Sequence, residues 1–199
     1  MSDLFERWSR TYDDAALQRL TYRTLHDAVV SVASAQRPGI ILDVGCGTGQ
    51  LTRRLTQLDW APTVYGLDMS TGMLDRARSS GAPLIRASAE ALPIADHSIE
   101  LITCTESFHW YTDQRGAAAE LARTLRPDGQ VVIISIATFT DVGASLLRRA
   151  TARRSPIRAL PPHRIRVLLK EAGLDVSEQR RLRRPTPPWP VLTLAQQSR

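Results

Sequence analysis

The sequence contains little cysteine and no long apolar run, and both shortages exclude classes of protein. Cys46 and Cys104 are its two cysteines. They are too few for a disulfide scaffold, and neither has another Cys or His at zinc-ligand spacing, so we expect no metal site. The longest strongly apolar stretch, Val131 to Phe139, is shorter than the roughly 20 residues that cross a bilayer, and the first residues lack a signal peptide's apolar region. We therefore expect a cytoplasmic protein.

Lysine is also nearly absent, because Lys170 is the single lysine beside 25 arginines. A Walker A phosphate-binding loop needs a Gly-Lys pair, but Leu169 precedes Lys170. A short-chain dehydrogenase needs a tyrosine four residues before the lysine, and that position holds Arg166. The sequence therefore excludes both of these nucleotide-dependent families.

Apolar periodicity predicts alternating strands and helices in a chain of 199 residues, enough for one domain. The expected strands are 40–44, 63–68, 84–87, 99–104, 130–136, 175–182 and 191–195. Helices are expected before residue 38, at 50–58 and 71–78, around 118–125 and around 165–172, while 138–162 resembles a linker. This alternation predicts an α/β fold with a doubly wound, mostly parallel sheet and helices on both faces. The last two strands, with no helix between them, predict an antiparallel hairpin at the sheet edge.

A glycine-rich turn, Gly45 to Gly49, follows the first expected strand. Such a turn lets a ligand approach the backbone at the carboxyl edge of a parallel sheet. Asp68 ends the second strand, 19 residues beyond Gly49, where a carboxylate can accept hydrogen bonds from both hydroxyls of a ribose. The spacing therefore predicts an adenosine-containing ligand.

Two details favour S-adenosylmethionine over a dinucleotide. Asp43 stands two residues before Gly45, where a carboxylate would repel a pyrophosphate and attract an ammonium group. The third glycine of the dinucleotide fingerprint would fall at position 50, which is Gln50. S-adenosylmethionine carries an ammonium group, a sulfonium and a ribose, so it matches both departures from the dinucleotide-binding pattern.

Five motifs in order then resemble the class I S-adenosylmethionine-dependent methyltransferases, in their small-molecule, type 11 branch. The motifs are Ile41 to Gly49, Val64 to Ser70 with Leu74, Ala89 to Pro93, Ser98 to Ile102 and Leu121 to Gly129. The opening Phe5 to Trp8 with Tyr12-Asp13 is similar to quinone methyltransferases, and Phe108 to Tyr111 resembles trans-aconitate and malonyl-carrier-protein methyltransferases. The resemblance implies a Rossmann-like seven-stranded sheet of order 3-2-1-4-5-7-6 with strand 7 antiparallel, and S-adenosylmethionine as cofactor.

The resemblance also implies cofactor-binding residues. It places Asp43, the three loop glycines and Thr105 around the methionine moiety. It places Asp68 at the ribose, and Met69, Ala89 and Ser88 at the adenine. The full expected set is Tyr12, Asp43, Gly45, Gly47, Gly49, Asp68, Met69, Ser88, Ala89 and Thr105. The family often has Asp, Asn or Gly where Ser88 stands, and a serine hydroxyl accepts a hydrogen bond from the adenine amine less strongly than a carboxylate.

Two residues after the fourth strand are candidates for catalysis. His109 follows the strand beside the expected methyl group, where it would act as a general base, or as a wall residue with Phe108 and Trp110. Glu106 would orient a substrate or cap the next helix. The other three histidines and both cysteines are expected to be structural or surface residues.

Positive charge gathers near the carboxyl end. Residues 1–140 carry 13 basic and 16 acidic side chains, whereas residues 141–199 carry 13 and 4. We expect a single domain over 1–199, with an N-terminal helical cap at 1–36 and a short basic lid at 138–162. The arginine-rich segment 148–184 suits an anionic substrate or an acidic membrane surface, or is a solvated helix face. Nucleic acid is not expected, because aromatic residues make up 6% of the chain and no RNA-binding module is present.

The expected activity is methyl transfer to an O, N or C nucleophile of a small organic molecule. Two alternatives remain at this point: an RNA-directed methyltransferase, and a non-catalytic module that binds the cofactor or a lipid. Steeply salt-dependent RNA binding would favour the first. Cofactor binding without turnover would favour the second. The sequence sets neither the acceptor nor the oligomeric state.

Overall fold

The computed structural model describes residues 16–138, 140–152, 157–183 and 189–198, with side chains from Tyr22 onward. Tyr12 and the first part of the expected cap therefore lie outside the described residues. The strands are β1 (Ile40–Val44), β2 (Thr63–Asp68), β3 (Leu84–Arg86), β4 (Ile99–Thr105), β5 (Leu125–Ile136), β6 (Leu174–Arg181) and β7 (Pro190–Gln197). The helices are α2 (Ala16–Gln36), α3 (Gln50–Thr56), α4 (Thr71–Ala77), α5 (Gln114–Thr124), α6 (Asp141–Thr151) and α7 (Pro162–Glu171), with short 3₁₀ helices η1 (Arg78–Ser80) and η2 (Phe108–Trp110).

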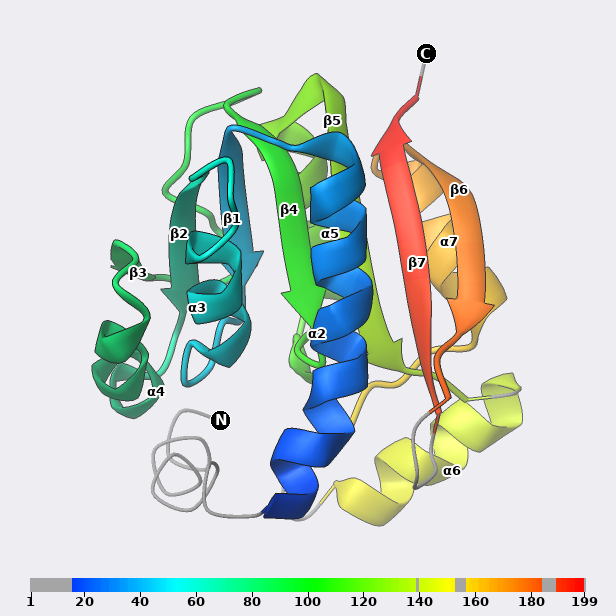
Figure 1. Cartoon of the computed structure of the whole chain (residues 1–199). Helices are drawn as coiled ribbons and strands as arrows, with labels where there is room; N and C mark the ends of the chain where they lie inside the picture. The colour runs from blue at the N-terminus through cyan, green and yellow to red at the C-terminus, as the bar shows by residue number, and fades with distance from the viewer. Residues whose placement is uncertain (1–15, 139, 153–156, 184–188, 199) are drawn as a thin grey trace.

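The seven strands form one sheet in the order β3-β2-β1-β4-β5-β7-β6 (Figure 1). The first five strands are parallel, whereas β7 runs antiparallel to both β5 and β6. The predicted strand order and the antiparallel β7 are therefore confirmed. Because β7 lies between β5 and β6, only β6 of the predicted hairpin forms the edge.

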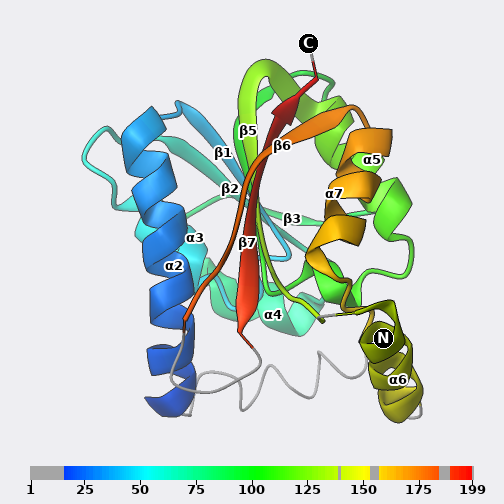
Figure 2. The ribbon, with the colours of Figure 1, turned by 90° about the vertical axis from the view of Figure 1, so that its right-hand side faces the viewer.

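Helices cover both faces of the sheet, as the alternation predicted (Figure 2). Successive side chains of a strand point to opposite faces, so each inner strand contributes to two cores. In β1, Ile41 packs in the core formed with α2 and α3, whereas Leu42 packs in the core formed with α5 and α7. This two-sided burial explains why β1 is apolar at every position except Asp43.

Two elements differ from the sequence prediction. Strand β5 begins at Leu125 rather than at residue 130, because Leu125 pairs with Ile99 before an irregularity in the ladder. The expected linker at 138–162 contains helix α6, whose start is capped by Thr140, which accepts from the N–H of Gly143 at 3.0 Å. No side chain of α6 is buried among the described residues, although the helix is amphipathic.

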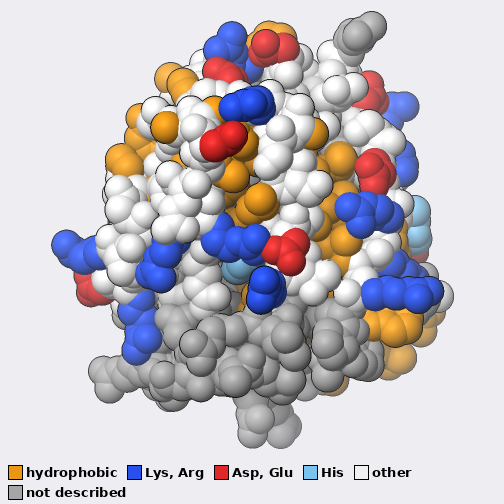
Figure 3. Space-filling model, in the orientation of Figure 1, with side chains coloured by type: hydrophobic (Ala, Val, Ile, Leu, Met, Phe, Trp, Pro, Cys, Tyr) orange, Lys and Arg blue, Asp and Glu red, His pale blue; other side chains and the backbone are white. Residues whose placement is uncertain are grey.

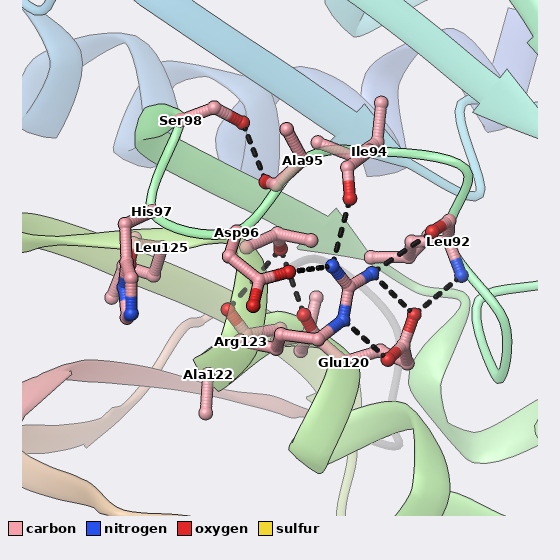
Figure 4. A network of polar contacts seen from close by, with 12 residues as sticks. Leu92, Ile94, Ala95, Asp96, His97, Ser98, Glu120, Ala122, Arg123 and Leu125 are labelled. Carbon is pink, nitrogen blue, oxygen red and sulfur yellow. Dashed lines mark hydrogen bonds and ion pairs between the residues drawn. The ribbon is translucent and has the colours of Figure 1, made fainter.

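Arg123 on α5 holds the segment that leads from the third motif into β4 (Figure 4). Its guanidinium donates to the carbonyl oxygens of Leu92 at 2.9 Å and Ile94 at 2.8 Å, and it pairs with Glu120 at 2.8 Å. The Glu120 and Asp96 carboxylates raise the pKa of Arg123 above its ordinary value. This network fixes the chain directly after residues 88–91, which line the site described below.

In the part of the chain that the structure describes, no helix is both long and apolar enough to cross a membrane. The same described residues contain no group of three or more His, Cys, Asp or Glu side chains that could hold a metal ion.

Candidate cofactor and acceptor site

A cavity of about 230 Å³ opens at the carboxyl ends of the parallel strands. This is the edge at which open α/β sheets bind ligands. Nine of the expected site residues line the cavity: Gly45, Gly47, Asp68, Met69, Ser88, Ala89, Thr105, Glu106 and His109. Asp43 instead lines a smaller neighbouring cavity of about 50 Å³, beneath the glycine loop.

The glycine loop needs its glycines for two different reasons. Gly45, Gly47 and Gly49 have φ angles of 71°, 56° and 76°, a left-handed conformation that other residues rarely adopt. A Cβ atom on Gly45 would lie 2.4 Å from Cβ of Ser107, and one on Gly49 would lie 2.9 Å from Cβ of Ala77. A Cβ on Gly47 would meet no atom within 4 Å among the described residues. Gly45 and Gly49 therefore allow close packing, while Gly47 leaves its backbone open to a ligand.

Asp68 joins the end of β2 to the glycine loop. Its Oδ2 accepts a hydrogen bond from the N–H of Gly47 at 3.0 Å, and its Oδ1 accepts one from the N–H of Ser70 at 2.9 Å. Each carboxylate oxygen can accept a further hydrogen bond. The side chain lines the cavity in a fixed orientation, as a ribose-binding carboxylate requires.

Asp43 lies beneath the loop, and its side chain is 2% exposed. Its two oxygens accept hydrogen bonds from the hydroxyls of Thr52 at 2.7 Å and Thr103 at 2.8 Å. Burial raises the pKa of Asp43 to about 6, although both threonine hydrogen bonds act in the opposite direction. Asp43 is therefore placed to act on a ligand through its charge rather than by lining the larger cavity.

This raised pKa predicts a pH dependence of cofactor affinity. Above about pH 6 Asp43 is ionised and attracts an ammonium group, and below that pH it becomes neutral. We expect S-adenosylmethionine to bind more weakly as the pH falls through 6, and we expect the variant Asp43→Asn to bind weakly with no such step. Titration calorimetry at pH 5 and pH 7.5 measures both; an equal step in the variant would remove Asp43 as its cause.

Met69 and residues 87–90 form another part of the cavity wall. Met69 is 40% exposed, and Ser88 Oγ accepts from the N–H of Glu90 at 3.1 Å. The carboxylate of Glu90 accepts from the N–H groups of Thr112 at 2.7 Å and Asp113 at 2.9 Å. Glu90 therefore ties this turn to the segment before α5, a role that has no signal in the sequence.

Thr105 lies where the two cavities meet, because it lines both. Its buried hydroxyl has no hydrogen-bond partner among the described residues. A buried polar group of this kind normally has a partner. An orphaned hydroxyl at this point fits a polar ligand that extends from one cavity toward the other.

His109 and Glu106 both line the cavity beyond Thr105. His109 is 2% exposed, and its Nδ1 lies 3.1 Å from Oγ of Ser135 on β5. Its ring centroid lies 5.0 Å from that of Trp110, so the histidine is part of an aromatic wall as well as of the cavity. Asp113 caps α5, accepting from the N–H of Gly116 at 2.9 Å. The roles predicted for Glu106 stay predictions.

Ser107 supports the glycine loop, although no local sequence pattern predicts this role. Its hydroxyl donates to the carbonyl oxygen of Val44 at 3.1 Å and accepts from the hydroxyl of Tyr111 at 3.0 Å. The thiol of Cys104 lies 3.0 Å from Oγ of Ser107. Burial raises the pKa of this thiol to about 11. Burial also raises the pKa of Cys46. Both thiols are thus buried and protonated, as expected for core residues.

The basic segment contributes Arg148 and Arg149, which are exposed at the end of α6. Val142 and Leu146 on the same helix are 69% and 60% exposed. In Figure 3, apolar and basic side chains lie next to each other at the lower right, where Figure 1 places α6. Arg153 and Arg154 lie outside the described residues, so the predicted lid at 138–162 stays a prediction.

His26 lines the smaller cavity and was expected to be structural. It is 8% exposed, and burial together with the charge of Arg54 lowers its pKa to about 4, against the opposing charge of Asp27. The unfolded chain therefore takes up this proton near pH 6.5, whereas the folded chain resists protonation until about pH 4.

Acid destabilisation follows from this lowered pKa. The contribution of His26 is fully present above pH 6.5 and is lost as the pH falls toward 4, by up to about 3 kcal/mol. Urea unfolding at pH 7 and pH 4.5 should show a smaller loss of stability for His26→Gln than for the unmodified chain. His163→Gln, at an exposed histidine, should change nothing; equal acid loss in both variants would contradict the prediction.

Comparison with known proteins places this site in a family. The model of a methyltransferase domain family matches residues 42–133. The malonyl-[acyl-carrier protein] O-methyltransferase of Dechloromonas aromatica is 37% identical over 180 residues, which are 85% of this chain and 63% of that protein. An uncharacterized methyltransferase of Geobacillus kaustophilus is 30% identical over 148 residues, which are 70% of this chain and 67% of that protein. This chain spans about half to two thirds of the length of such curated relatives.

A solved structure shares the whole fold. The magnesium protoporphyrin IX methyltransferase of Synechocystis, crystallised with bound S-adenosylhomocysteine, superposes with a TM-score of 0.74 and 21% identity. The match covers 99% of this chain and 95% of that one. The seven-stranded architecture is therefore that of a known methyltransferase fold.

Proposed function

This chain belongs to the class I S-adenosylmethionine-dependent methyltransferases, and we propose that it transfers the methyl group of S-adenosylmethionine to a nucleophilic atom of a small organic acceptor. The observation that carries the proposal is the continuity of the cavity. The same cavity is lined by the glycine loop and Asp68 and also by Glu106 and His109. One cavity can therefore hold a cofactor and an acceptor side by side.

The residues present fit the cofactor on three observations. Gly47 leaves space at the loop backbone, the carboxylate of Asp68 is fixed and faces the cavity, and the hydroxyl of Thr105 lacks a partner among the described residues. We assign the methionine moiety to the loop glycines with Thr105 and the charge of Asp43, and the ribose to Asp68. The adenine is assigned to the exposed Met69 with Ser88 and Ala89.

The reaction requires the protein mainly to place the cofactor and the acceptor next to each other. S-adenosylmethionine, when bound, supplies a methyl group already activated by its sulfonium. Proximity and alignment therefore supply most of the rate enhancement. The buried loop and the wall formed by η2 hold the reacting groups and exclude water. His109 takes up a proton only where the acceptor atom must lose one.

The test of the function is direct labelling. The purified chain is incubated with methyl-labelled S-adenosylmethionine and a small-molecule extract, and the labelled product is identified by mass spectrometry. Malonyl-[acyl-carrier protein] is the first defined acceptor to include, because relatives bear its name. Asp68→Ala is the control that should abolish the label. Cofactor binding without any labelled product would favour a non-catalytic module, and label in RNA alone would favour an RNA-directed enzyme.

A further inference from the structure

We infer that Glu90 is a positioning residue that joins two parts of the site, so that a bound cofactor orders the wall beside the acceptor. The first part is the adenine turn, residues 88–91, which the N–H of Ala91 closes by donating to the carbonyl oxygen of Ser88 at 3.2 Å. The second part is the acceptor wall, residues 107–113, which includes η2. The inference rests on the proposed function, because that proposal assigns the adenine to this turn.

The hydrogen bonds of Glu90 have a single possible direction. One carboxylate oxygen, Oε1, accepts from the backbone N–H groups of Thr112 at 2.7 Å and Asp113 at 2.9 Å. A backbone N–H can only donate, and a carboxylate oxygen accepts. Hydrogen bonds from backbone N–H groups to a carboxylate are stronger than those between neutral groups. The carboxylate also lies at the start of α5, where a negative charge is favourable.

The chain after the adenine turn is fastened to the same helix. The N–H of Leu92 donates to Oε2 of Glu120 at 2.6 Å, and its carbonyl oxygen accepts from Arg123 at 2.9 Å (Figure 4). Glu120 and Arg123 lie near the end of α5, whereas Asp113, which Glu90 holds, is its N-cap residue. The turn is therefore attached at both ends of one helix, which makes the turn and α5 a connected unit.

The acceptor wall lies between two segments that are assigned to the cofactor. At its first residue, Oγ of Ser107 is 3.1 Å from the carbonyl oxygen of Val44, which directly precedes the glycine loop. At its end, Thr112 and Asp113 are held by Glu90 of the adenine turn. Five residues of this wall line the cavity. The position of the wall therefore depends on the segments that contact the cofactor.

This arrangement gives a route from the cofactor to the wall. An adenine seated against Ser88 and Ala89 restricts the turn, and the carboxylate of Glu90 moves less as a result. The N–H groups of Thr112 and Asp113 then keep their acceptor for more of the time. Order that a first ligand imposes need not be imposed again by a second. A bound cofactor therefore prepares the wall for the acceptor.

Amide hydrogen exchange followed by nitrogen-15 NMR tests this coupling without any acceptor. In the free chain, Glu90→Ala should exchange the amides of Thr112 and Asp113 roughly 10-fold faster, because these amides lose their hydrogen-bond acceptor. Saturating S-adenosylhomocysteine should slow exchange across residues 107–113 in the unmodified chain, and Glu90→Ala should lose this slowing. Glu90→Gln should retain it, because one oxygen accepts both N–H groups and glutamine keeps a carbonyl oxygen.

Gln114→Ala is the matched control. The Gln114 amide also makes two hydrogen bonds, to the carbonyl oxygens of Phe108 and Arg158, both at 3.0 Å. It reaches the wall from α5 rather than from the adenine turn. This variant should loosen the wall in the free chain and still show the slowing by S-adenosylhomocysteine. A merely structural role for Glu90 would make the two variants behave alike.

The slowing of exchange, if it persists in Glu90→Ala saturated with S-adenosylhomocysteine, would overturn the inference, because the cofactor would then act on the wall without Glu90. Unprotected amides of Thr112 and Asp113 in the unmodified chain would do the same, even if Glu90→Ala does not fold. Failure of S-adenosylhomocysteine to bind the unmodified chain would overturn the proposed function and with it the coupling. The free-chain comparison would then still report the hydrogen bonds of Glu90.

Discussion

Replacing Asp68 by alanine is expected to weaken the binding of S-adenosylmethionine by about 2 to 4 kcal/mol, or roughly 30- to 700-fold. The carboxylate would accept two ribose hydroxyls through charge-assisted hydrogen bonds. It also holds the N–H groups of Gly47 and Ser70, so its removal loosens the loop that meets the cofactor. Titration calorimetry measures the affinity, and circular dichroism confirms that the variant keeps its fold.

Two further variants separate these contributions. Asp68→Asn keeps one oxygen acceptor without the charge, and its affinity should lie between those of Asp68→Ala and the unmodified chain. Asp75→Ala removes an exposed carboxylate of α4 that pairs with Arg78, and it should bind as the unmodified chain does. Unchanged affinity in Asp68→Ala would show that the ribose lies elsewhere.

Gly45→Ala is expected to destabilise the fold by about 2 to 5 kcal/mol. The new Cβ would adopt a φ of 71° and lie 2.4 Å from Cβ of Ser107, so backbone strain and overpacking add together. Ser107 cannot retreat easily, because its hydroxyl bridges the carbonyl of Val44 and the hydroxyl of Tyr111. Urea unfolding of the purified variant measures the loss.

Gly47→Ala is the matched comparison, since its φ is also positive but its Cβ meets no described atom within 4 Å. It should cost about 1 to 2 kcal/mol of stability and should reduce cofactor affinity, because Gly47 lines the cavity. Ser107→Gly should lessen the cost of Gly45→Ala by removing the contacted Cβ atom. Equal stability of the two alanine variants would show that packing against Ser107 is unimportant.

The sequence by itself predicted the strands of the sheet and, through the glycine turn and Asp68, the edge of the sheet at which the cavity opens. Mostly apolar stretches predict buried strands such as β1. The glycine turn and Asp68 lie within one βα unit and the strand that follows it. These signals are local, whereas the strand order that the structure shows was implied by the resemblance to the methyltransferase family. Helix α6 lies in the segment that the sequence predicted as a linker, and none of its described side chains is buried.

Only the tertiary structure decided which residues support the site. Thr103 is 60 residues from Asp43 and Ser107 is 63 residues from Val44, yet each pair is joined by a hydrogen bond. Ser135 reaches His109 across 26 residues because β4 and β5 are neighbours in the sheet. Local sequence patterns do not predict partners that are so distant in the chain. Hydrogen bonds between distant segments exist only once the strands have paired, and that pairing places Asp43 under the loop and His109 in the wall.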